Sequence, residues 1–424
     1  MKVLVIGNGG REHALCMFIK QSPICKKLFC IPGSDSIQEV AGCFKIDPMN
    51  NTDILEFCKK HEIDFVVVGP ELPLSNGIVD RLVKEKIIVF GPNKTSSRLE
   101  TSKIFMKNIC KKHNIATAKY SIFDKEKDAL NFLNHIDFPT VIKADGLAAG
   151  KGVIIANNKK EAEETIKNIM SKKIFGSSGK NIIIEEFLEG EEISFFALVD
   201  TNGFVLPLTT AQDHKKIGDG DRGLNTGGMG AYSPVPFIKQ NQINDFVIKF
   251  VKPIINDLKL NDIFFSGVFY AGFIMSKNGP KLLEINVRFG DPEAQAILPR
   301  LKTDLLDLLL ASSTGKLDQF KSLEWDDNYS MNVVMASKGY PETYKKNTVI
   351  NGLNKIVTNK SRYIFHSSTK RSEDHWLATG GRVLSICSLG STLKEARNNV
   401  YNIISKIDWK NAYFRKDIGW KHLT

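Results

Sequence analysis

The sequence predicts a protein of several domains in the α/β and α+β classes. Its first hundred residues alternate short apolar strands with amphipathic helices, and three of these strands end in glycine. That alternation is typical of a parallel sheet with helices on both faces. Two later segments mix strands and helices without this regular alternation, which predicts α+β units. The chain has 424 residues, 42% of them hydrophobic, which suffices for two or three domains with cores of their own.

The parallel sheet is expected in a first domain, residues 1–101. Its strands are predicted at 3–6, 28–31, 65–68 and 87–90, and its helices at 12–19, 54–58 and 78–83. Ligands of such sheets bind at the carboxyl ends of the strands. The glycines that end three of the strands (Gly7, Gly69 and Gly91) therefore indicate the edge at which a ligand binds.

The first of these ends, Gly7-Asn8-Gly9-Gly10-Arg11-Glu12, is similar to a dinucleotide-binding turn but departs from it twice. Glu12 stands where that motif has its third glycine, and the second strand ends in Ile31-Pro32-Gly33 with no acid placed for a ribose. A helix N-terminus that follows a glycine turn still binds anions. The turn thus favours a sugar phosphate over NAD, with a tight turn that binds nothing as the alternative.

A second domain is predicted over residues 102–324. It starts with a helix at 102–113, for which Ser102 is a suitable N-cap. The elements expected next are strand 118–122, helix 125–135, a strand ending at Lys143, strand 153–156, helix 159–172 and strand 182–184. They form a small α+β module.

Residues 143–153, the glycine loop, join two successive strands of this module. Their glycines and lysines predict contact with phosphate. The loop is not a Walker motif, because three residues lie between Gly146 and Gly150 where that motif has four, and Gly152 follows Lys151 where it has Ser or Thr. A hairpin tip that folds over a phosphate compound, with Lys143 fixed at its root, is expected instead.

Two polar stretches follow the module. Five glutamates fall within residues 185–192 directly after a buried strand, and their oxygens are suited to an adenine amino group and ribose hydroxyls; a plain acidic turn is the alternative. After strands 193–199 and 204–208, residues 212–230 are so rich in glycine and aspartate that no regular structure is expected there. Asp213, His214 and Lys215 among these glycines favour a functional loop over a disordered one.

A candidate metal site lies in the strand 281–286, which is preceded by helix 243–258 and strand 267–275. Glu284 and Asn286 are two residues apart, so their side chains share one face of the strand. Two oxygen ligands suit Mg²⁺, which takes its remaining ligands from water and substrate phosphates. Arg288 is expected on the same face, where a guanidinium would stabilise a phosphoryl group in transfer. An ordinary sheet edge is the alternative.

The last domain is predicted over residues 325–424, after a leucine-rich core helix at 301–310. It contains strands 332–335 and 383–387 and a helix 393–407 with one apolar stripe. Residues 330–424 hold 16 Lys and Arg against 6 Asp and Glu, so most of the net charge of +11 lies here. Because these basic residues are dispersed, we expect no nucleic acid partner and instead an attraction of small anions.

Composition and the lack of certain motifs argue against a membrane protein, a disulfide-bonded protein and an enzyme with a covalent acyl intermediate. No apolar run approaches the roughly 20 residues that a membrane span requires, so no membrane association is expected. The seven cysteines include no Cys-x-x-Cys pair, which favours free thiols and a cytoplasmic protein. No Gly-x-Ser-x-Gly or Cys/His arrangement supports a covalent acyl-enzyme.

Several of these motifs together resemble the phosphoribosylamine–glycine ligase family of the ATP-grasp superfamily, from one end of the chain to the other. The matching stretches are Val5 to Leu15, Val68 to Glu71, the glycine loop, Glu185 to Leu188, Gln212 to Lys215, Asn225 to Pro234 and Arg288 to Glu293. The last two are the most specific. The resemblance implies a Rossmann-like N-terminal domain, an ATP-grasp core with a small mobile lid at about 122–192, and a C-terminal α+β domain.

The resemblance also implies a reaction. ATP, glycine and 5-phosphoribosylamine would give ADP, phosphate and glycinamide ribonucleotide, with a glycyl phosphate intermediate, in purine synthesis. The implied nucleotide contacts are Lys103 and Lys143 on phosphates, Gly150, Lys151 and Gly152 in the covering loop, Glu185, Glu186 and Leu188 at adenine, and Glu192 at ribose. Glu284 and Asn286 would hold Mg²⁺ or Mn²⁺.

The remaining implied residues handle the other two substrates. They are Gly9, Gly10, Pro70, Glu71, Lys215, Asn225, Thr226, Gly227 and Gly228, with Asp213 and Arg288 as catalytic residues for glycine and the transferring phosphate. Three departures from the family pattern remove none of these groups: Ser34-Asp35-Ser36 after Gly33, Thr101 before Ser102, and the lack of a proline near Ala116-Thr117. A monomer is expected, with a dimer as the alternative.

Two other functions remain open at this point. Another ATP-grasp carboxylate–amine ligase or a transformylase would share the nucleotide half but not the stretch 213–234. A basic nucleic-acid-binding protein would use the C-terminal charge, and its binding would weaken steeply with salt. It leaves residues 284–293 without an explanation.

Overall fold

The computed structural model describes residues 1–148 and 151–423. Its N-terminal part is a parallel sheet of order β3-β2-β1-β4-β5, as the sequence predicts. The strands are β1 Lys2–Gly7, β2 Lys27–Pro32, β3 Gly42–Cys43, β4 Phe65–Val68 and β5 Ile88–Phe90, and the helices are α1 Gly10–Lys20, α2 Asn51–His61, α3 Glu71–Ser75 and α4 Ile78–Lys84. The strand β3 and the helix α3 were not expected, because two and five residues are too few to give a pattern in the sequence.

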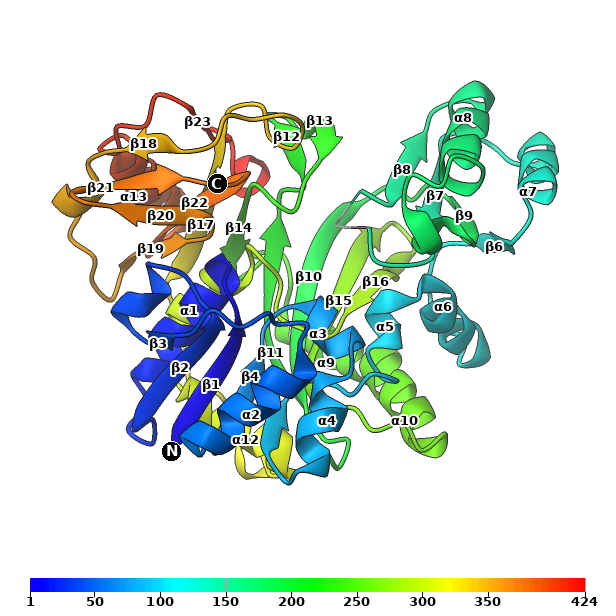
Figure 1. The fold of residues 1–424 in the computed structure, drawn as a ribbon. Helices are drawn as coiled ribbons and strands as arrows, with labels where there is room; N and C mark the ends of the chain where they lie inside the picture. Colours follow the sequence, from blue (N-terminus) through cyan, green and yellow to red (C-terminus); the bar gives the residue numbers. More distant parts are fainter. Residues whose placement is uncertain (149–150, 424) are drawn as a thin grey trace.

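A four-stranded antiparallel module of order β6-β9-β7-β8 follows and stands apart from the rest at the upper right of Figure 1. It contains β6 Tyr120–Phe123, α7 Glu126–Phe132, β7 Thr140–Ala144, β8 Val153–Ala156, α8 Lys159–Met170 and β9 Ile182–Glu186, and α5 Arg98–Thr101 and α6 Lys103–Lys112 precede it. Ile142, Ile166 and Ile182 are fully buried in a core of its own.

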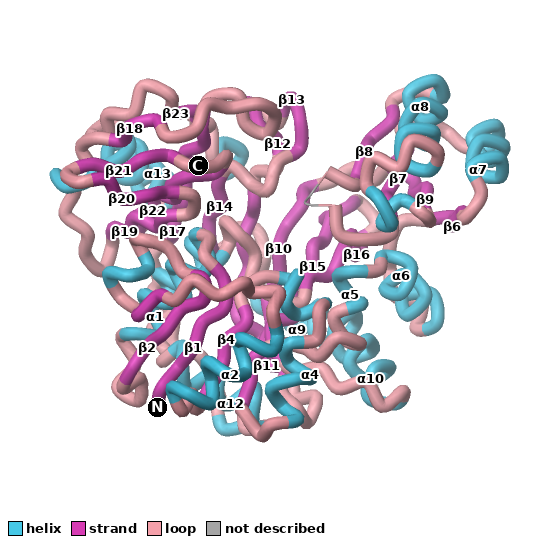
Figure 2. The backbone as a smooth tube through the Cα atoms, viewed as in Figure 1, coloured by secondary structure: helices cyan, strands magenta, loops and turns pink. Residues whose placement is uncertain are grey.

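The central sheet combines strands from the middle of the chain with strands from its C-terminal part. Their order is β16-β15-β10-β11-β14-β17-β22-β19, with β23 beside β17. Its strands are β10 Glu191–Val199, β11 Val205–Asp213, β14 Gly230–Ser233, β15 Gly267–Ser276, β16 Gly279–Asn286, β17 Tyr329–Ser337, β19 Arg362–His366, β22 Arg382–Gly390 and β23 Ala412–Tyr413. Because β14 pairs with β17, the C-terminal strands extend the same sheet. Figure 2 shows these strands through the middle of the molecule.

Helices and a small sheet cover the central sheet. The helices are α9 Gln240–Phe246, α10 Lys252–Leu260, α11 Ala294–Ile297, α12 Leu305–Thr314 and α13 Leu393–Ile404, and the small sheet has the order β18-β21-β20, with β18 Thr348–Ile350, β20 Thr369–Ser372 and β21 His375–Ala378. The predicted helix 301–310 begins later, at Leu305, because Asp304 accepts a hydrogen bond from the backbone of Asp307 and so caps it. No helix within residues 1–148 and 151–423 is long and apolar enough to cross a bilayer.

The prediction that residues 212–230 lack regular structure is wrong. β11 continues to Asp213, and β12 Lys216–Gly218 and β13 Arg222–Asn225 form a hairpin before β14. Its strands are too short and too glycine-rich to show a pattern in the sequence. Contacts with the C-terminal segment, described below, hold the hairpin in place, and a local sequence pattern cannot reveal them.

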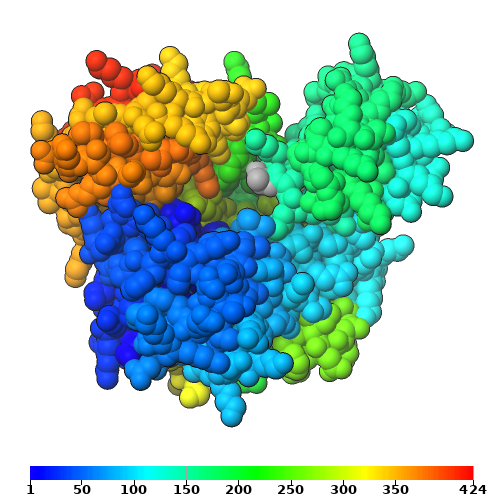
Figure 3. All heavy atoms as spheres, viewed as in Figure 1, coloured from blue at the N-terminus to red at the C-terminus, as the bar shows by residue number. Residues whose placement is uncertain are grey.

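Figure 3 shows the surface hollowed between the four-stranded module and the C-terminal region. The edges of this hollow come from segments far apart in the sequence, including the β12–β13 hairpin (Figure 1).

Candidate active site

A buried glutamate fixes the lysine at the root of the glycine loop. The carboxylate of Glu185, at the end of β9, lies 2.7 Å from Nζ of Lys143 and 2.9 Å from Nζ of Lys107. Although burial opposes it, the charges of Lys143 and Lys107 lower the pKa of Glu185. The Glu185 side chain is thus paired with two lysines, and its predicted contact with adenine stays a prediction. Lys107 is fully buried and was not predicted to take part in the site.

The glycine loop is fastened to the start of α6. Nζ of Lys103 donates to the carbonyls of Ala144 and Gly146, at 3.0 and 3.1 Å. In return, Asp145 accepts from the backbone of Ile104 at 3.0 Å. Lys143 pairs with Val153 across β7 and β8, which confirms the predicted hairpin. Gly150 lies outside the described residues.

Lys215 lies between two carboxylates. Its Nζ is 3.3 Å from Oε1 of Glu284 and 3.4 Å from Oε2 of Glu192. The charge of Lys215 is the main reason why the pKa of Glu284 falls to about 2. Lys215, directly before β12, therefore contacts both the predicted metal ligand Glu284 and the predicted ribose ligand Glu192.

Glu284 and Asn286 share one face of β16, as predicted. Ile285 between them is 2% exposed and faces the core. Gly272 lies opposite Glu284 in β15, and a Cβ there would come within 3.0 Å of Cγ of Glu284, so glycine leaves room for the carboxylate. An ionised carboxylate and an amide oxygen fit Mg²⁺ or Mn²⁺. No group of three or more His, Cys, Asp or Glu side chains suited to a metal occurs in the described part of the chain.

Asp213 contributes to this site a carboxylate oxygen that lacks a hydrogen bond within the described part of the chain. Its Oδ1 is buried and has no hydrogen-bond partner among the described residues. Burial, and next the charge of Glu293, raise its pKa well above the usual range. Asp213, Lys215, Glu192 and Tyr270 line one small cavity. A carboxylate of this kind is suited to a ligand that brings its own positive charge.

Arg288 is held by two acids of the N-terminal half. Its Nη2 lies 2.9 Å from Oε1 of Glu100, and its Nε lies 3.2 Å from Oε2 of Glu71. Glu100 and Glu71 raise its pKa although burial opposes this. The strand β16 ends at Asn286, so the alternation of faces along the strand does not extend to Arg288. The two ion pairs orient the Arg288 side chain instead.

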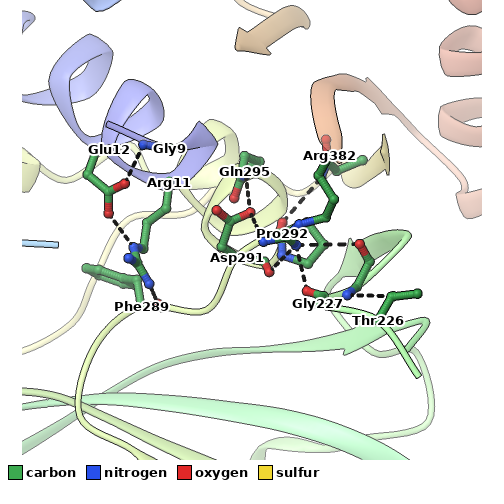
Figure 4. A network of polar contacts seen from close by, with 12 residues as sticks. Gly9, Arg11, Glu12, Thr226, Gly227, Phe289, Asp291, Pro292, Gln295 and Arg382 are labelled. Carbon is green, nitrogen blue, oxygen red and sulfur yellow. Dashed lines mark hydrogen bonds and ion pairs between the residues drawn. The ribbon is translucent and has the colours of Figure 1, made fainter. Parts of the chain in front are cut away.

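Figure 4 shows how Glu12 completes the first glycine turn. Its carboxylate accepts from the backbone N–H of Gly9 at 2.8 Å and pairs with Arg11 at 2.6 Å. A Cβ on Gly7 or Gly69 would lie within 2.3 Å of the Glu12 side chain. Glu12 thus occupies the space and the donor that a dinucleotide would need, in agreement with the sequence argument against NAD.

The other half of this network brings in Arg382, from the start of β22 (Figure 4). Its Nη1 donates to the carbonyls of Gly227 and Asp291, both at 2.6 Å. Asp291 in turn accepts from Gln295 at 2.8 Å, and a Cβ on Gly10 would lie 2.7 Å from Nε2 of Gln295. The predicted turns at 9–10 and 227–228 are therefore neighbours, linked by an arginine that the sequence pattern did not single out.

Other predicted residues lie farther from these contacts. Glu186 pairs with Lys281 at 2.9 Å, and Lys151 is exposed. Asn225 donates to the carbonyl of Val153 at 3.4 Å, so the hairpin touches the four-stranded module. The remaining predicted residues lie in connecting segments: Pro70 before α3, Leu188 between β9 and β10, Gly152 before β8, and Thr226, whose hydroxyl accepts from the backbone of Gly228.

Comparison with known proteins assigns the chain to a family. Residues 1–100, 101–294 and 330–421 match the N domain, the ATP-grasp (A) domain and the C domain of phosphoribosylglycinamide synthetase. The phosphoribosylamine–glycine ligase of Caldanaerobacter subterraneus subsp. tengcongensis is 45% identical over 419 residues, 99% of each chain. The chloroplastic phosphoribosylamine–glycine ligase of Arabidopsis thaliana is 45% identical over 99% of this chain and 82% of its own.

Solved structures agree with this assignment. A phosphoribosylamine–glycine ligase from Thermotoga maritima superposes with a TM-score of 0.84 at 29% identity, over 98% of this chain and all of that one. A biotin carboxylase domain from Hydrogenobacter thermophilus, at 16% identity and a TM-score of 0.75, shares the fold alone. The chain belongs to the phosphoribosylglycinamide synthetase family, whose central domain is an ATP-grasp domain.

Proposed function

We propose that the protein joins glycine to 5-phosphoribosylamine at the expense of ATP and so makes glycinamide ribonucleotide in purine biosynthesis. Names of relatives and the family match support this proposal. The observation that carries it is Oδ1 of Asp213, which is buried, has no hydrogen-bond partner among the described residues and belongs to a side chain that lines the same cavity as Lys215. Glycine has an ammonium for Asp213 and a carboxylate for a cation. Formate and bicarbonate have no ammonium, so this site favours glycine over the substrates of a transformylase or a carboxylase.

The proposed chemistry proceeds in two steps. A carboxylate oxygen of glycine attacks the γ-phosphorus of ATP, the bond to the bridging oxygen breaks, and ADP leaves with the electron pair. The amine of 5-phosphoribosylamine then attacks the carbonyl carbon of glycyl phosphate, loses a proton and expels inorganic phosphate. The protein contributes position and charge: Asp213 holds the ammonium, Lys215 lies beside the reacting carboxylate, and Arg288 faces the transferred phosphoryl group.

The nucleotide is proposed to lie between the four-stranded module and β16. Lys103 and Lys143 would contact its phosphates, residues 185–188 its adenine and Glu192 its ribose, with Lys151 and Gly152 in the loop that covers it. Mg²⁺ or Mn²⁺, held by Glu284 and Asn286, would neutralise charge on the phosphates. The ion pair with Glu185 orients Lys143, which supports this placement.

Phosphoribosylamine is proposed to bind where the N-terminal sheet meets the C-terminal region. The residues proposed for it are Gly9, Gly10, Pro70, Glu71, Asn225, Thr226, Gly227 and Gly228. The contact of Gln295 with Gly10 and of Arg382 with Gly227 supports a shared pocket. Since Glu12 already accepts from the N–H of Gly9, the phosphate would take other donors of this pocket.

We further propose that the protein acts as a monomer in the cytoplasm. All seven cysteines are free, which supports a reducing compartment. Light scattering after size exclusion would test the monomer.

The direct test of the proposed function is ADP release by the purified protein with glycine and 5-phosphoribosylamine together. We expect release only with both, and an Asp213→Asn variant with a KM for glycine raised at least tenfold and a nearly unchanged KM for ATP. ADP release with formate or bicarbonate in the absence of glycine would refute the proposal.

A further inference from the structure

The β12–β13 hairpin is held by an arginine near the C-terminus. Arg415 is 0% exposed, although it lies only a few residues from the end of the chain. Its Nη1 donates to the carbonyl of Lys216 at 3.1 Å and pairs with Oδ1 of Asp221 at 2.8 Å. One guanidinium thus contacts the first strand and the turn of a hairpin about two hundred residues earlier in the chain. Figure 1 shows the hairpin beside the C-terminal segment.

Asp417 extends the same contact to the hairpin's turn. Arg415 binds it in two places, from Nε to Oδ1 at 2.7 Å and from Nη2 to Oδ2 at 2.8 Å. Oδ2 of Asp417 also accepts from the backbone N–H of Gly220 at 2.7 Å. Although burial opposes it, the hydrogen bond from Arg415 helps lower the pKa of Asp417 to about 2. Such two-point pairs fix orientation as well as charge.

Further contacts from the same segment reach the start of the hairpin. The hydroxyl of Tyr413 donates to the carbonyl of Ile217 at 2.8 Å, and the backbone N–H of Gly419 donates to Nε2 of His214 at 3.1 Å. The strands are only three and four residues long and pair with no other strand. An isolated hairpin of this length has little stability of its own. Its position therefore depends on the C-terminal segment.

The hairpin matters because Lys215 stands directly before β12. The next residue, Lys216, is the one whose carbonyl Arg415 holds. We propose that Arg415 is a positioning residue of the ligase: it locks the hairpin so that Lys215 faces Glu284 and the glycine site. This inference rests on the proposed function for its catalytic consequence, but the release of the hairpin is measurable without it.

Two variants separate positioning from general stability. Arg415→Lys keeps the charge but loses the two-point pairing with Asp417. Asp221→Asn removes the ion pair between Arg415 and the turn of the hairpin. The Asp221 side chain is 34% exposed, so this position tolerates substitution better than Arg415 does. Lys421→Met is the matched control. Nζ of the exposed Lys421 lies 2.8 Å from Oδ2 of the same Asp221, and this side chain has no hydrogen bond to the backbone of the hairpin among the described residues.

Three readouts are taken on the full-length protein. For both variants we expect kcat to fall at least tenfold and KM for glycine to rise, while KM for ATP stays within twofold and the melting temperature stays well above the assay temperature. Limited trypsin digestion should cut after Arg222, which is exposed in β13, at least fivefold faster than in the unmodified protein. Lys421→Met should match the unmodified protein in all three.

Two results would overturn the inference. One is a folded Arg415→Lys or Asp221→Asn variant with kcat and glycine KM within twofold of the unmodified protein. The other is a loss of activity that follows the unfolded fraction alone, without faster cleavage after Arg222. If the unmodified protein shows no glycine-dependent activity, the proposed function fails, and the cleavage experiment still decides whether Arg415 holds the hairpin.

Discussion

Nζ of Lys215 lies 3.3 Å from Oε1 of Glu284, so a cation of the β12–β13 region already occupies the carboxylate predicted to bind the metal. The pair brings together a strand of the central sheet and a segment that the sequence suggested would be irregular. If Glu284 holds the metal and Lys215 contacts glycine, as proposed, Lys215 competes with the metal for the carboxylate of Glu284.

Replacing Lys215 by Met should separate these two proposed roles of the lysine. We expect kcat to fall by roughly a hundredfold, because the carboxylate of glycine loses its neighbouring cation. In the absence of nucleotide, Mn²⁺ should bind about tenfold more tightly, since a full positive charge next to Glu284 has been removed. Electron paramagnetic resonance of free Mn²⁺ measures the affinity. Unchanged Mn²⁺ binding would show that Lys215 does not compete at Glu284.

Glu284→Gln and Asn286→Ala should each cut turnover by at least about a hundredfold while the protein stays folded, because both side chains lie on the half-exposed face of β16. Lys277→Ala, in the exposed turn before that strand, is the control and should keep full activity. Circular dichroism melts and steady-state kinetics over a Mg²⁺ titration provide the measurements. A parallel loss of melting temperature and activity would indicate a structural role instead.

Asp213→Asn should raise the stability of the folded protein while it weakens the binding of glycine. An acid with a raised pKa in the folded state binds more protons folded than unfolded, so stability declines as pH rises from the unfolded pKa of about 4 to the folded value. Asparagine removes this decline. We therefore expect a melting temperature about 2–4 °C higher than that of the unmodified protein at pH 7.5, and a smaller difference toward pH 4. Equal melting curves at both pH values would contradict a strained carboxylate at this position.

The two lysines on Glu185 should behave differently. Lys143→Met is expected to raise KM for ATP at least tenfold with a modest change in melting temperature, because Lys107 still neutralises Glu185. Lys107→Met should mainly lower the melting temperature, since this lysine is fully buried. Nucleotide titrations and thermal melts distinguish the two. The assignment of Lys143 to ATP would be withdrawn if both variants changed KM equally.

The family and the elements with strong local patterns could be predicted from the sequence. The strands of the N-terminal sheet, the cap of α6 by Ser102 and the hairpin rooted at Lys143 follow from apolar runs, capping chemistry and the spacing of glycines. Glu284 and Asn286 were placed on one face because alternation in a strand is a local property. Motifs that run from end to end of the chain identified the family.

What the sequence did not reveal depends on contacts between distant segments. Arg382 joins Gly227 to Asp291, and Lys107 reaches Glu185, with nothing in the neighbouring residues to mark either side chain. Arg288 was expected to follow the strand's alternation, but its ion pairs with Glu71 and Glu100 decide its direction. The β12–β13 hairpin was missed for the same reason, because Arg415 supplies its support from the other end of the chain.

The most direct test of the whole account follows the oxygen atoms of glycine. The protein is given ATP, 5-phosphoribosylamine and glycine labelled with ¹⁸O in both carboxylate oxygens, and the inorganic phosphate is analysed by mass spectrometry. If the γ-phosphoryl group is transferred to glycine's carboxylate, each phosphate released carries one ¹⁸O and each glycinamide ribonucleotide keeps the other. Unlabelled phosphate formed together with ADP would contradict a glycyl phosphate intermediate and the ligase proposed here.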